Sequence, residues 1–130
     1  MKKVLVVDDQ NGWRNFNSKT VYEILGNDII LDTASCAKEG YSKLLESKEN
    51  PYDFLLTDMQ MENDFYPLMA GEWLIEQAQN LSFCYKTKII IISATANIRL
   101  IAGHYNVDCI PKSVAATSLE PFKELITPFC

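Results

Sequence analysis

The sequence predicts an α/β fold, with a single doubly wound sheet of five parallel strands and helices on both of its faces. Three observations predict this fold. Five short segments are almost wholly apolar or β-branched, as is typical of strands that are covered on both faces. Amphipathic segments with helical spacing separate them, and the connections are brief. Since parallel strands need right-handed crossovers that place a helix over the sheet, this alternation indicates a parallel arrangement.

The strand segments share a high content of valine, isoleucine, leucine and phenylalanine. They are residues 3–7, 29–33, 54–57, 88–92 and 107–110. Their composition suits strands that are buried between two layers of helices.

The segment after the first strand predicts a helix. Its positions with helical spacing are Trp13, Phe16, Thr20, Val21 and Ile24. Gly26 is placed to end this helix in the left-handed conformation, which glycine adopts most easily. We expect the apolar face of the helix to lie on the sheet.

A second helix is predicted to begin near Ser35, whose hydroxyl is a plausible N-cap. Its apolar face carries Ala37, Tyr41, Leu44 and Leu45. Pro51 lies between this helix and the next predicted strand.

Three further helices complete the alternation. The third runs from about Gly71 through residues 73–78, and the fourth is a short one around Ile98 and Ile101. The last starts near Ser118 or Glu120, because the proline that follows is acceptable in a first turn. A second proline at position 128 limits that helix to about two turns.

Size and composition indicate one globular domain. The chain has 130 residues, of which 48% are hydrophobic and 22% are charged. This is the balance of a chain that folds around its own core. We therefore expect residues 1–130 to form a single domain.

Charge and hydropathy exclude two classes of partner. Twelve basic against seventeen acidic residues give a net charge of −5, and no cluster of lysine and arginine forms a stripe that could neutralise nucleic-acid phosphates. The longest apolar stretches, residues 4–7 and 89–92, are far below the roughly 20 residues that a membrane-spanning helix needs. The amino terminus lacks the long apolar region of a signal peptide. We expect a cytoplasmic protein that binds neither nucleic acid nor membranes.

The four cysteines, at positions 36, 84, 109 and 130, are widely scattered and form no C-x-x-C pair. His104 is the only histidine, so a nitrogen partner for a metal is scarce as well. This spacing favours reduced structural thiols over a zinc site or a disulfide framework. We expect no functional role for His104.

Polar side chains follow the strands at their carboxyl ends. Asp8 and Asp9 close the first strand, Asp58 the third and Ser93 the fourth, and Lys112 follows the fifth. In a doubly wound sheet the ligand site lies beyond these ends. The fold would therefore bring three carboxylates, one hydroxyl and one ammonium to a single edge.

This mixture of groups has a chemical logic. Crowded carboxylates stay ionised at neutral pH only when a cation compensates them, and an oxygen-only site suits Mg²⁺. The metal and the Lys112 ammonium would offset the repulsion between the Asp58 carboxylate and an incoming phosphoryl group, giving an acyl phosphate. Ser93 could then donate a hydrogen bond to a phosphoryl oxygen.

Four segments carry a resemblance to a known family. They are Val4-Leu5-Val6-Val7-Asp8-Asp9, Leu55-Leu56-Thr57-Asp58-Met59-Gln60-Met61, Ile91-Ile92-Ser93-Ala94 and Ile110-Pro111-Lys112. Together, in this order, they resemble the motifs of response-regulator receiver domains of two-component signalling. The resemblance extends from Lys2 to about Leu125 and implies the flavodoxin-like form of the predicted sheet.

The resemblance also implies a metal site. Asp9 matches the acid that binds Mg²⁺ directly, and Asp8 would bind it directly or through water. Asp58 would be a further ligand, and the main-chain carbonyl two residues later, that of Gln60, would complete the protein's share. Mg²⁺ is the only cofactor implied.

A signalling role follows from the same resemblance. Asp58 matches the phosphoacceptor, while Ser93 and Lys112 match the hydroxyl and the lysine that assist the transfer. The phosphoryl group would come from a histidine kinase or a histidine phosphotransfer protein, and the output would pass to a downstream protein, with a phosphorylation-dependent dimer left open. Such a domain catalyses only its own phosphorylation and dephosphorylation and is not an enzyme in the ordinary sense.

The chain departs from the family pattern at three places. Residues 62–69 form an insertion beside the expected site, and Gly71 comes several residues late. Cys109 stands where many receivers carry an aromatic switch residue. Ser113, in place of proline, follows the active-site Lys112. These departures favour an altered output face, with the insertion as a lid, a partner contact or a tolerated elongation.

One alternative function stays open: a pseudo-receiver that binds partners constitutively without phosphorylation. Other classes are weaker. An aspartyl phosphatase needs an acid two residues after its nucleophile, and a flavin or nucleotide carrier needs a glycine-rich loop after the first strand. The sequence has neither feature. Taken alone, Asp8 and Asp9 would be no more than a helix N-cap. Trp13, Trp73 and Tyr41 are interpreted as packing residues.

Overall fold

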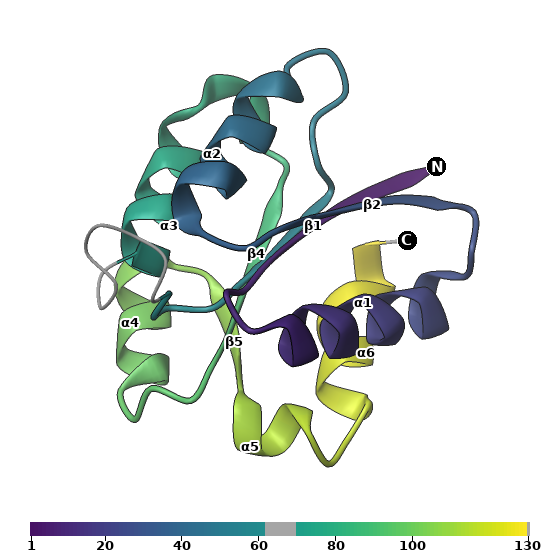
Figure 1. Ribbon diagram of the computed structural model, residues 1–130, viewed down its shortest axis with the longest axis vertical. Coiled ribbons are helices and arrows are strands. Elements are labelled where there is room, and N and C mark those ends of the chain that lie inside the picture. The colour runs from purple at the N-terminus through teal and green to yellow at the C-terminus, as the bar shows by residue number, and fades with distance from the viewer. Residues whose placement is uncertain (62–69, 130) are drawn as a thin grey trace.

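The computed structural model describes residues 1–61 and 70–129 (Figure 1). Five strands form one sheet in the order β2-β1-β3-β4-β5, and all neighbours are parallel. The strands are β1 (Lys2–Val7), β2 (Ile29–Ala34), β3 (Phe54–Thr57), β4 (Lys88–Ser93) and β5 (Asp108–Pro111). The predicted doubly wound parallel sheet is confirmed.

Helices connect the strands. They are α1 (Asn11–Leu25), α2 (Ala37–Glu46), α3 (Ala70–Asn80), α4 (Ile98–Tyr105), α5 (Lys112–Ala115) and α6 (Glu120–Ile126), with the 3-10 helices η2 (Ser82–Cys84) and η3 (Thr127–Phe129). The four-residue α5, which begins at Lys112 itself, was not predicted. Among the described helices, none is long and apolar enough to cross a membrane.

The helices cover the sheet in two layers. In Figure 1, α2, α3 and α4 lie on one side of the strands, and α1, α5 and α6 lie on the other. The side chains of β1 alternate between these layers: Leu5 and Val7 pack under the first layer, Val4 and Val6 under the second, and all four are fully buried. Each such side chain contributes about 1.5–3 kcal/mol of hydrophobic stabilisation.

Some local predictions were wrong. The N-cap of α2 is Cys36 rather than Ser35, and the Cys36 sulfur accepts a hydrogen bond from the Glu39 N–H at 3.4 Å. Gly26 does end α1 with a positive φ of 83°, but its ψ of −176° is extended, not left-handed helical.

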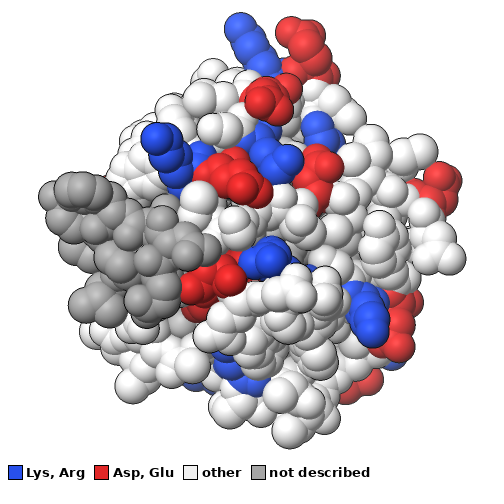
Figure 2. All heavy atoms as spheres, viewed as in Figure 1, with Lys and Arg blue, Asp and Glu red and all other residues white. Residues whose placement is uncertain are grey.

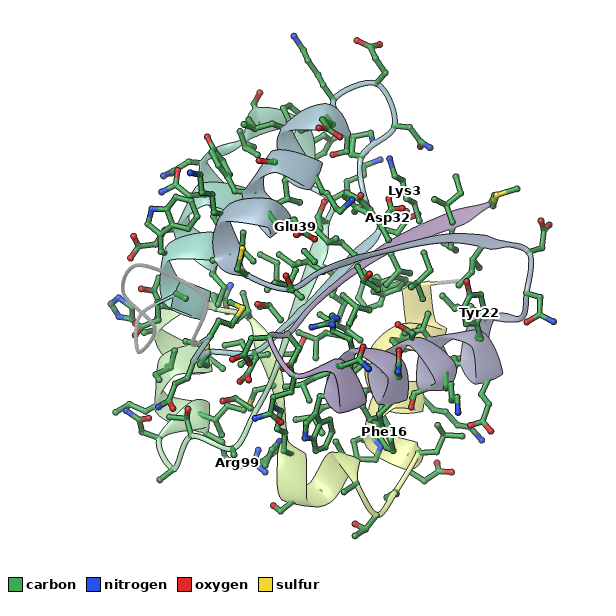
Figure 3. All side chains as sticks on the ribbon, in the orientation of Figure 1. Lys3, Phe16, Tyr22, Asp32, Glu39 and Arg99 are labelled. Carbon is green, nitrogen blue, oxygen red and sulfur yellow. The ribbon has the colours of Figure 1, made fainter. Side chains whose placement is uncertain are left out.

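Three residues predicted for apolar helix faces are more exposed than expected. Phe16 is 37%, Leu45 45% and Trp73 39% exposed. Phe16, labelled on α1 in Figure 3, packs edge-on against Trp13 with the ring centroids 5.2 Å apart. Trp73 packs in the same way against Tyr41. Helical spacing identifies the apolar stripe, but residues at its margin rest on neighbouring side chains and not on the sheet.

The carboxyl end of α4 is tied to α3. The Tyr105 hydroxyl lies 2.8 Å from Glu76 Oε1 and 3.2 Å from Glu72 Oε1. The Gln79 side-chain amide donates to the Tyr105 carbonyl at 2.8 Å. Burial and these two acceptors raise the pKa of the Tyr105 phenol further above neutral pH. We call this set of contacts the Tyr105 clasp.

On the face shown in Figure 2, acidic and basic side chains are interspersed and most of the surface is uncharged. No large patch of one sign is visible among the coloured residues of this face. Such a surface offers no continuous basic track for a nucleic acid there.

Candidate functional site

The strand register places the predicted site residues at one edge of the sheet. Val7, the last residue of β1, is the partner of Thr57, the last residue of β3. Asp8 and Asp58 are the next residues, so they leave the sheet side by side, and the Asp58 N–H donates to the Val7 carbonyl at 3.0 Å. On the other side, Ser93 of β4 is the partner of Pro111 in β5. Lys112 follows directly and points back to the carboxylates.

Asp8 is a fully buried carboxylate with an incomplete set of partners. Its Oδ1 accepts the Gln10 N–H at 2.9 Å. Its Oδ2 lies 3.1 Å from the Lys112 ammonium, but the angle does not make a hydrogen bond, and no other donor among the described residues reaches it. Burial raises the pKa of Asp8, and the nearby Asp58 charge raises it further, against the lowering effects of the Gln10 N–H and Lys112. One oxygen of this carboxylate therefore pairs with the Lys112 charge but accepts no hydrogen bond from the described residues.

Asp58 is also buried, but both of its oxygens are engaged. Oδ1 accepts the Met59 N–H at 2.7 Å, and Oδ2 accepts the Lys112 ammonium at 3.0 Å. Lys112, only 8% exposed, thus bridges two carboxylates from different strands. The bridge fixes the direction in which the Asp58 carboxylate faces.

The three carboxylates form a set that fits a hard divalent cation. One oxygen each from Asp8, Asp9 and Asp58 lies within 4.8 Å of the others. The donors are all oxygen, as Mg²⁺ and Ca²⁺ prefer, and a cation there would add positive charge beside the Asp8 carboxylate, one oxygen of which accepts no hydrogen bond from the described residues. The residues present therefore fit the metal that the sequence predicted.

The carboxylates open onto a cavity of about 370 Å³. Its lining includes Asp9, Asp58, Gln60, Ser93 and Lys112, so five of the six predicted site residues face one space. The sixth, fully buried Asp8, lies behind them. Ligation of a metal by the Gln60 carbonyl stays a prediction.

Ser93 faces this cavity with its hydroxyl already paired. Its Oγ lies 3.0 Å from Thr95 Oγ1 and accepts the Thr95 N–H at 3.2 Å. The side chain is 1% exposed. Either hydroxyl can be the donor in the contact between Ser93 and Thr95, so the Ser93 proton can be directed to Thr95 or to a group in the cavity.

Several residues at the site escaped the sequence prediction. Gln10, Met59 and Thr95 act through main-chain N–H groups, and those are common to almost all residue types. Trp13, predicted to be a packing residue, has its ring 4.9 Å from the Lys112 ammonium. Its place in the first turn of the helix after Asp8 and Asp9 was the signal that could have revealed it.

Other predicted features lie elsewhere or outside the described part. The insertion at residues 62–69 and Cys130 lie outside the described residues. Cys109, at the position of the usual aromatic switch, is partly buried in β5 against the α4 layer. Cys36, Cys84 and Cys109 have free thiols. His104 is exposed on α4, with its ring edge-on to Tyr105.

Replacing Asp8 with asparagine is expected to stabilise the metal-free protein at pH 7 by about 1 kcal/mol, because it removes a buried negative charge that faces the charge of Asp58. A carboxyl with a raised folded pKa favours folding below its ordinary value of 3.8 and loses that contribution as the pH rises through the folded pKa. The advantage of the variant should therefore shrink between pH 7 and pH 4. Thermal unfolding in EDTA at both pH values measures it, and a lower midpoint for Asp8→Asn at pH 7 would contradict the expectation.

Comparison with known proteins finds similarity in structure alone. No family model matches the sequence, and no curated protein matches it. Solved structures do match, with TM-scores above 0.6 over nearly the whole chain.

Many of the matching structures are response regulators or their receiver domains. The chemotaxis response regulator CheY4 of Vibrio cholerae has 21% identity and a TM-score of 0.75, covering 97% of this chain and 99% of that one. A CheY-like receiver domain protein from Methanospirillum hungatei has 24% identity and a TM-score of 0.67, covering 99% and 96%. The receiver domain of RcsB from Salmonella enterica serovar Typhimurium, in the presence of phosphomimetic BeF₃⁻, has 18% identity and a TM-score of 0.73, covering 98% and 88%.

These similarities confirm, at the level of the fold, the resemblance that the sequence motifs indicated. They cover at least 97% of this chain and at least 88% of each of the three structures, so the described sheet and its helices take part. The chain has the fold of the response-regulator receiver domains.

Proposed function

We propose that this chain is a working receiver domain, in which Asp58 accepts a phosphoryl group in a Mg²⁺-dependent transfer and the phosphorylated domain signals by protein contact. The observation that carries the proposal is the setting of the Asp58 carboxylate. Met59 N–H and the Lys112 ammonium hold its two oxygens at 2.7 and 3.0 Å, beside a cavity that Ser93 also lines. A nucleophile is thus held beside a space that can admit a phosphoryl group.

The proposed metal would be held by Asp8, Asp9 and Asp58, with the Gln60 carbonyl as a further ligand. Mg²⁺, when bound, would neutralise charge that develops between the carboxylate and the phosphoryl oxygens. The fit is supported by the mutual distances of the three carboxylates and by an Asp8 oxygen that accepts no hydrogen bond from the described residues.

The chain's own residues account for the rest of the transfer. A carboxylate oxygen of Asp58 forms a bond to phosphorus while the bond from phosphorus to the donor's nitrogen or oxygen breaks and the donor keeps that electron pair. Lys112 then exchanges part of its contact with Asp58 for a phosphoryl oxygen, which keeps the added negative charge compensated. Ser93 turns from Thr95 to donate to a second phosphoryl oxygen.

A histidine kinase or a histidine phosphotransfer protein is the proposed donor, and a downstream protein is the proposed target. The similarity to a receiver domain obtained with phosphomimetic BeF₃⁻ supports phosphorylation of the site. On this proposal the chain catalyses only its own phosphorylation and dephosphorylation. A constitutive pseudo-receiver is the alternative.

The proposal is tested by incubating the protein with acetyl phosphate and Mg²⁺ and measuring its intact mass. We expect the mass of one added phosphoryl group, located on Asp58 by peptide mapping after borohydride reduction of the acyl phosphate. Asp58→Asn and an EDTA-treated sample are the controls, and neither should gain the group. Asparagine keeps the size and the Met59 contact of the side chain but is not a nucleophile.

The outcome that would overturn the proposal is equally specific. If the native protein gains no phosphoryl group, and if Mg²⁺ with beryllofluoride leaves its thermal midpoint unchanged, the site does not take a phosphoryl group. A bound ligand present at 100 times its dissociation constant would stabilise the fold by about 2.7 kcal/mol. An unchanged midpoint would therefore favour the pseudo-receiver.

A further inference from the structure

The Lys112 ammonium meets three groups, and one of them is aromatic. Asp8 Oδ2 and Asp58 Oδ2 lie 3.1 and 3.0 Å from Nζ. The centroid of the Trp13 ring lies 4.9 Å from the same atom. Because the Lys112 side chain is only 9% exposed, little water reaches the charge. The indole occupies part of the space next to the ammonium that water would otherwise fill.

Trp13 is held at this position by the first turn of α1. Within the described residues, Gln10, the N-cap, makes no side-chain capping bond. Arg14 anchors the turn instead: its Nη1 donates to the Asp8 carbonyl at 2.8 Å and its Nη2 to Asn11 Oδ1 at 3.1 Å. The residue next to Trp13 is thus bonded to the residue that carries one of the site carboxylates.

The ring is also packed from the other side. Phe16 contacts it edge to face, with the ring planes at 67°. Trp13 itself packs against the buried cluster under α1, α5 and α6. The indole can therefore not turn away from Lys112 without disturbing a packed layer.

An aromatic face suits a cation that has to change partners. A side chain with a hydrogen-bond acceptor would hold the ammonium in one direction and compete with the incoming phosphoryl oxygens. The attraction between a cation and a ring acts within about 6 Å of the centroid and demands no single direction. It is strongest for tryptophan and weaker for phenylalanine.

We propose that Trp13 is a positioning residue for Lys112: its ring keeps the ammonium between Asp8 and Asp58 and lets it shift to a phosphoryl oxygen without becoming hydrated. This inference rests on the proposed function for its effect on phosphorylation. Its effect on Lys112 itself does not depend on that function.

Two variants separate the attraction of the ring for the ammonium from the space that the ring fills. Trp13→Phe keeps a weaker aromatic face, and Trp13→Leu keeps an apolar side chain without one. We expect the rate of Asp58 phosphorylation by acetyl phosphate with Mg²⁺ to fall about threefold in the first and about tenfold in the second. Trp73→Leu is the matched control, since Trp73 is the other tryptophan of the chain and packs on Tyr41. Its rate should equal that of the native protein.

A second measurement follows the ammonium directly. In metal-free protein labelled with ¹⁵N-lysine, the Lys112 ammonium signal is assigned by its loss in Lys112→Met. We expect its protons to exchange with water several-fold faster in Trp13→Leu than in the native protein, with Trp13→Phe between them. A purely structural role of Trp13 would lower the thermal midpoint without this graded order.

The outcomes separate the inference from the proposed function. A graded loss of phosphorylation rate together with graded ammonium exchange supports both. Equal exchange in all three proteins, or equal phosphorylation rates, overturns the positioning role of Trp13. If the native protein takes no phosphoryl group at all, the proposed function fails, and the ammonium exchange alone then decides whether Trp13 positions Lys112.

Discussion

A Gly71→Ala variant is expected to lose at least about 3 kcal/mol of stability, with a fall of about 10 °C or more in the thermal midpoint. A methyl group on Gly71 would lie 2.2 Å from the Asp58 carbonyl oxygen and 2.5 Å from Met59 Cα. Both are main-chain atoms, so no side chain can move aside to relieve the clash. The Gly71 N–H also donates to the Met59 carbonyl at 2.9 Å. Relief requires that α3 move away from the strand end that carries Asp58.

The damage should extend to the function. Because the clash falls on the backbone of Asp58 and Met59, we expect phosphorylation of any folded Gly71→Ala protein to be slower by at least tenfold. Gly103→Ala is the matched control: it is also a helical glycine, and a methyl group there meets nothing within 4 Å. That substitution should raise stability by about 0.5–1 kcal/mol, since glycine disfavours a helix. Equal midpoints for the two variants would contradict the packing argument.

A Lys112→Met variant is expected to lose about 3 kcal/mol of stability at pH 7 in EDTA. Methionine keeps most of the length and the apolar stem, so the change removes chiefly the charge. Asp8 and Asp58 would then face each other, both buried, without the cation that now bridges them. Mg²⁺ should restore part of the lost stability, because a bound cation supplies the missing compensation.

Phosphorylation should suffer more than stability in this variant. The loss of one charged donor at a site of developing negative charge costs about 100-fold in rate, so we expect a fall of that size with acetyl phosphate and saturating Mg²⁺. Lys19→Met, at an exposed position of α1, is the control and should match the native protein. A Lys112→Met protein that is phosphorylated at the native rate would remove Lys112 from the mechanism.

Most of the fold could be predicted, because the strands are fully apolar and the helices are amphipathic. The position of the site could be predicted from the same pattern. The carboxyl ends of parallel strands lie at one edge of the sheet, so Asp8, Asp58 and Ser93 were expected to lie close together there. The contact of Gly71 with Asp58 could not be predicted, since it depends on the path of the chain after β3. The Cys36 cap escaped because serine is the commoner cap and stands one residue earlier.

Trp13 shows a different kind of limit. Helical spacing correctly assigned it to the inner face of its helix, but spacing does not tell which group of the sheet lies opposite. The group opposite Trp13 depends on where α1 begins relative to the end of β1. The hydrogen bond from Arg14 to the Asp8 carbonyl holds the first turn of α1 at that place. An interpretation as a packing residue and a contact with Lys112 were equally compatible with the sequence.

The Tyr105 clasp ties the carboxyl end of α4 to α3, and buried Ile98 seats its amino end. Its carboxyl end is bonded to α3, whereas its amino end continues directly from the segment that contains Ser93 and Thr95. A displacement of Ser93 would therefore move the amino end of α4 more than its carboxyl end, and the helix would tilt. Leu100, 76% exposed, lies in that half of the helix. The orientation of this apolar side chain toward a neighbouring molecule would then depend on whether the cavity is filled.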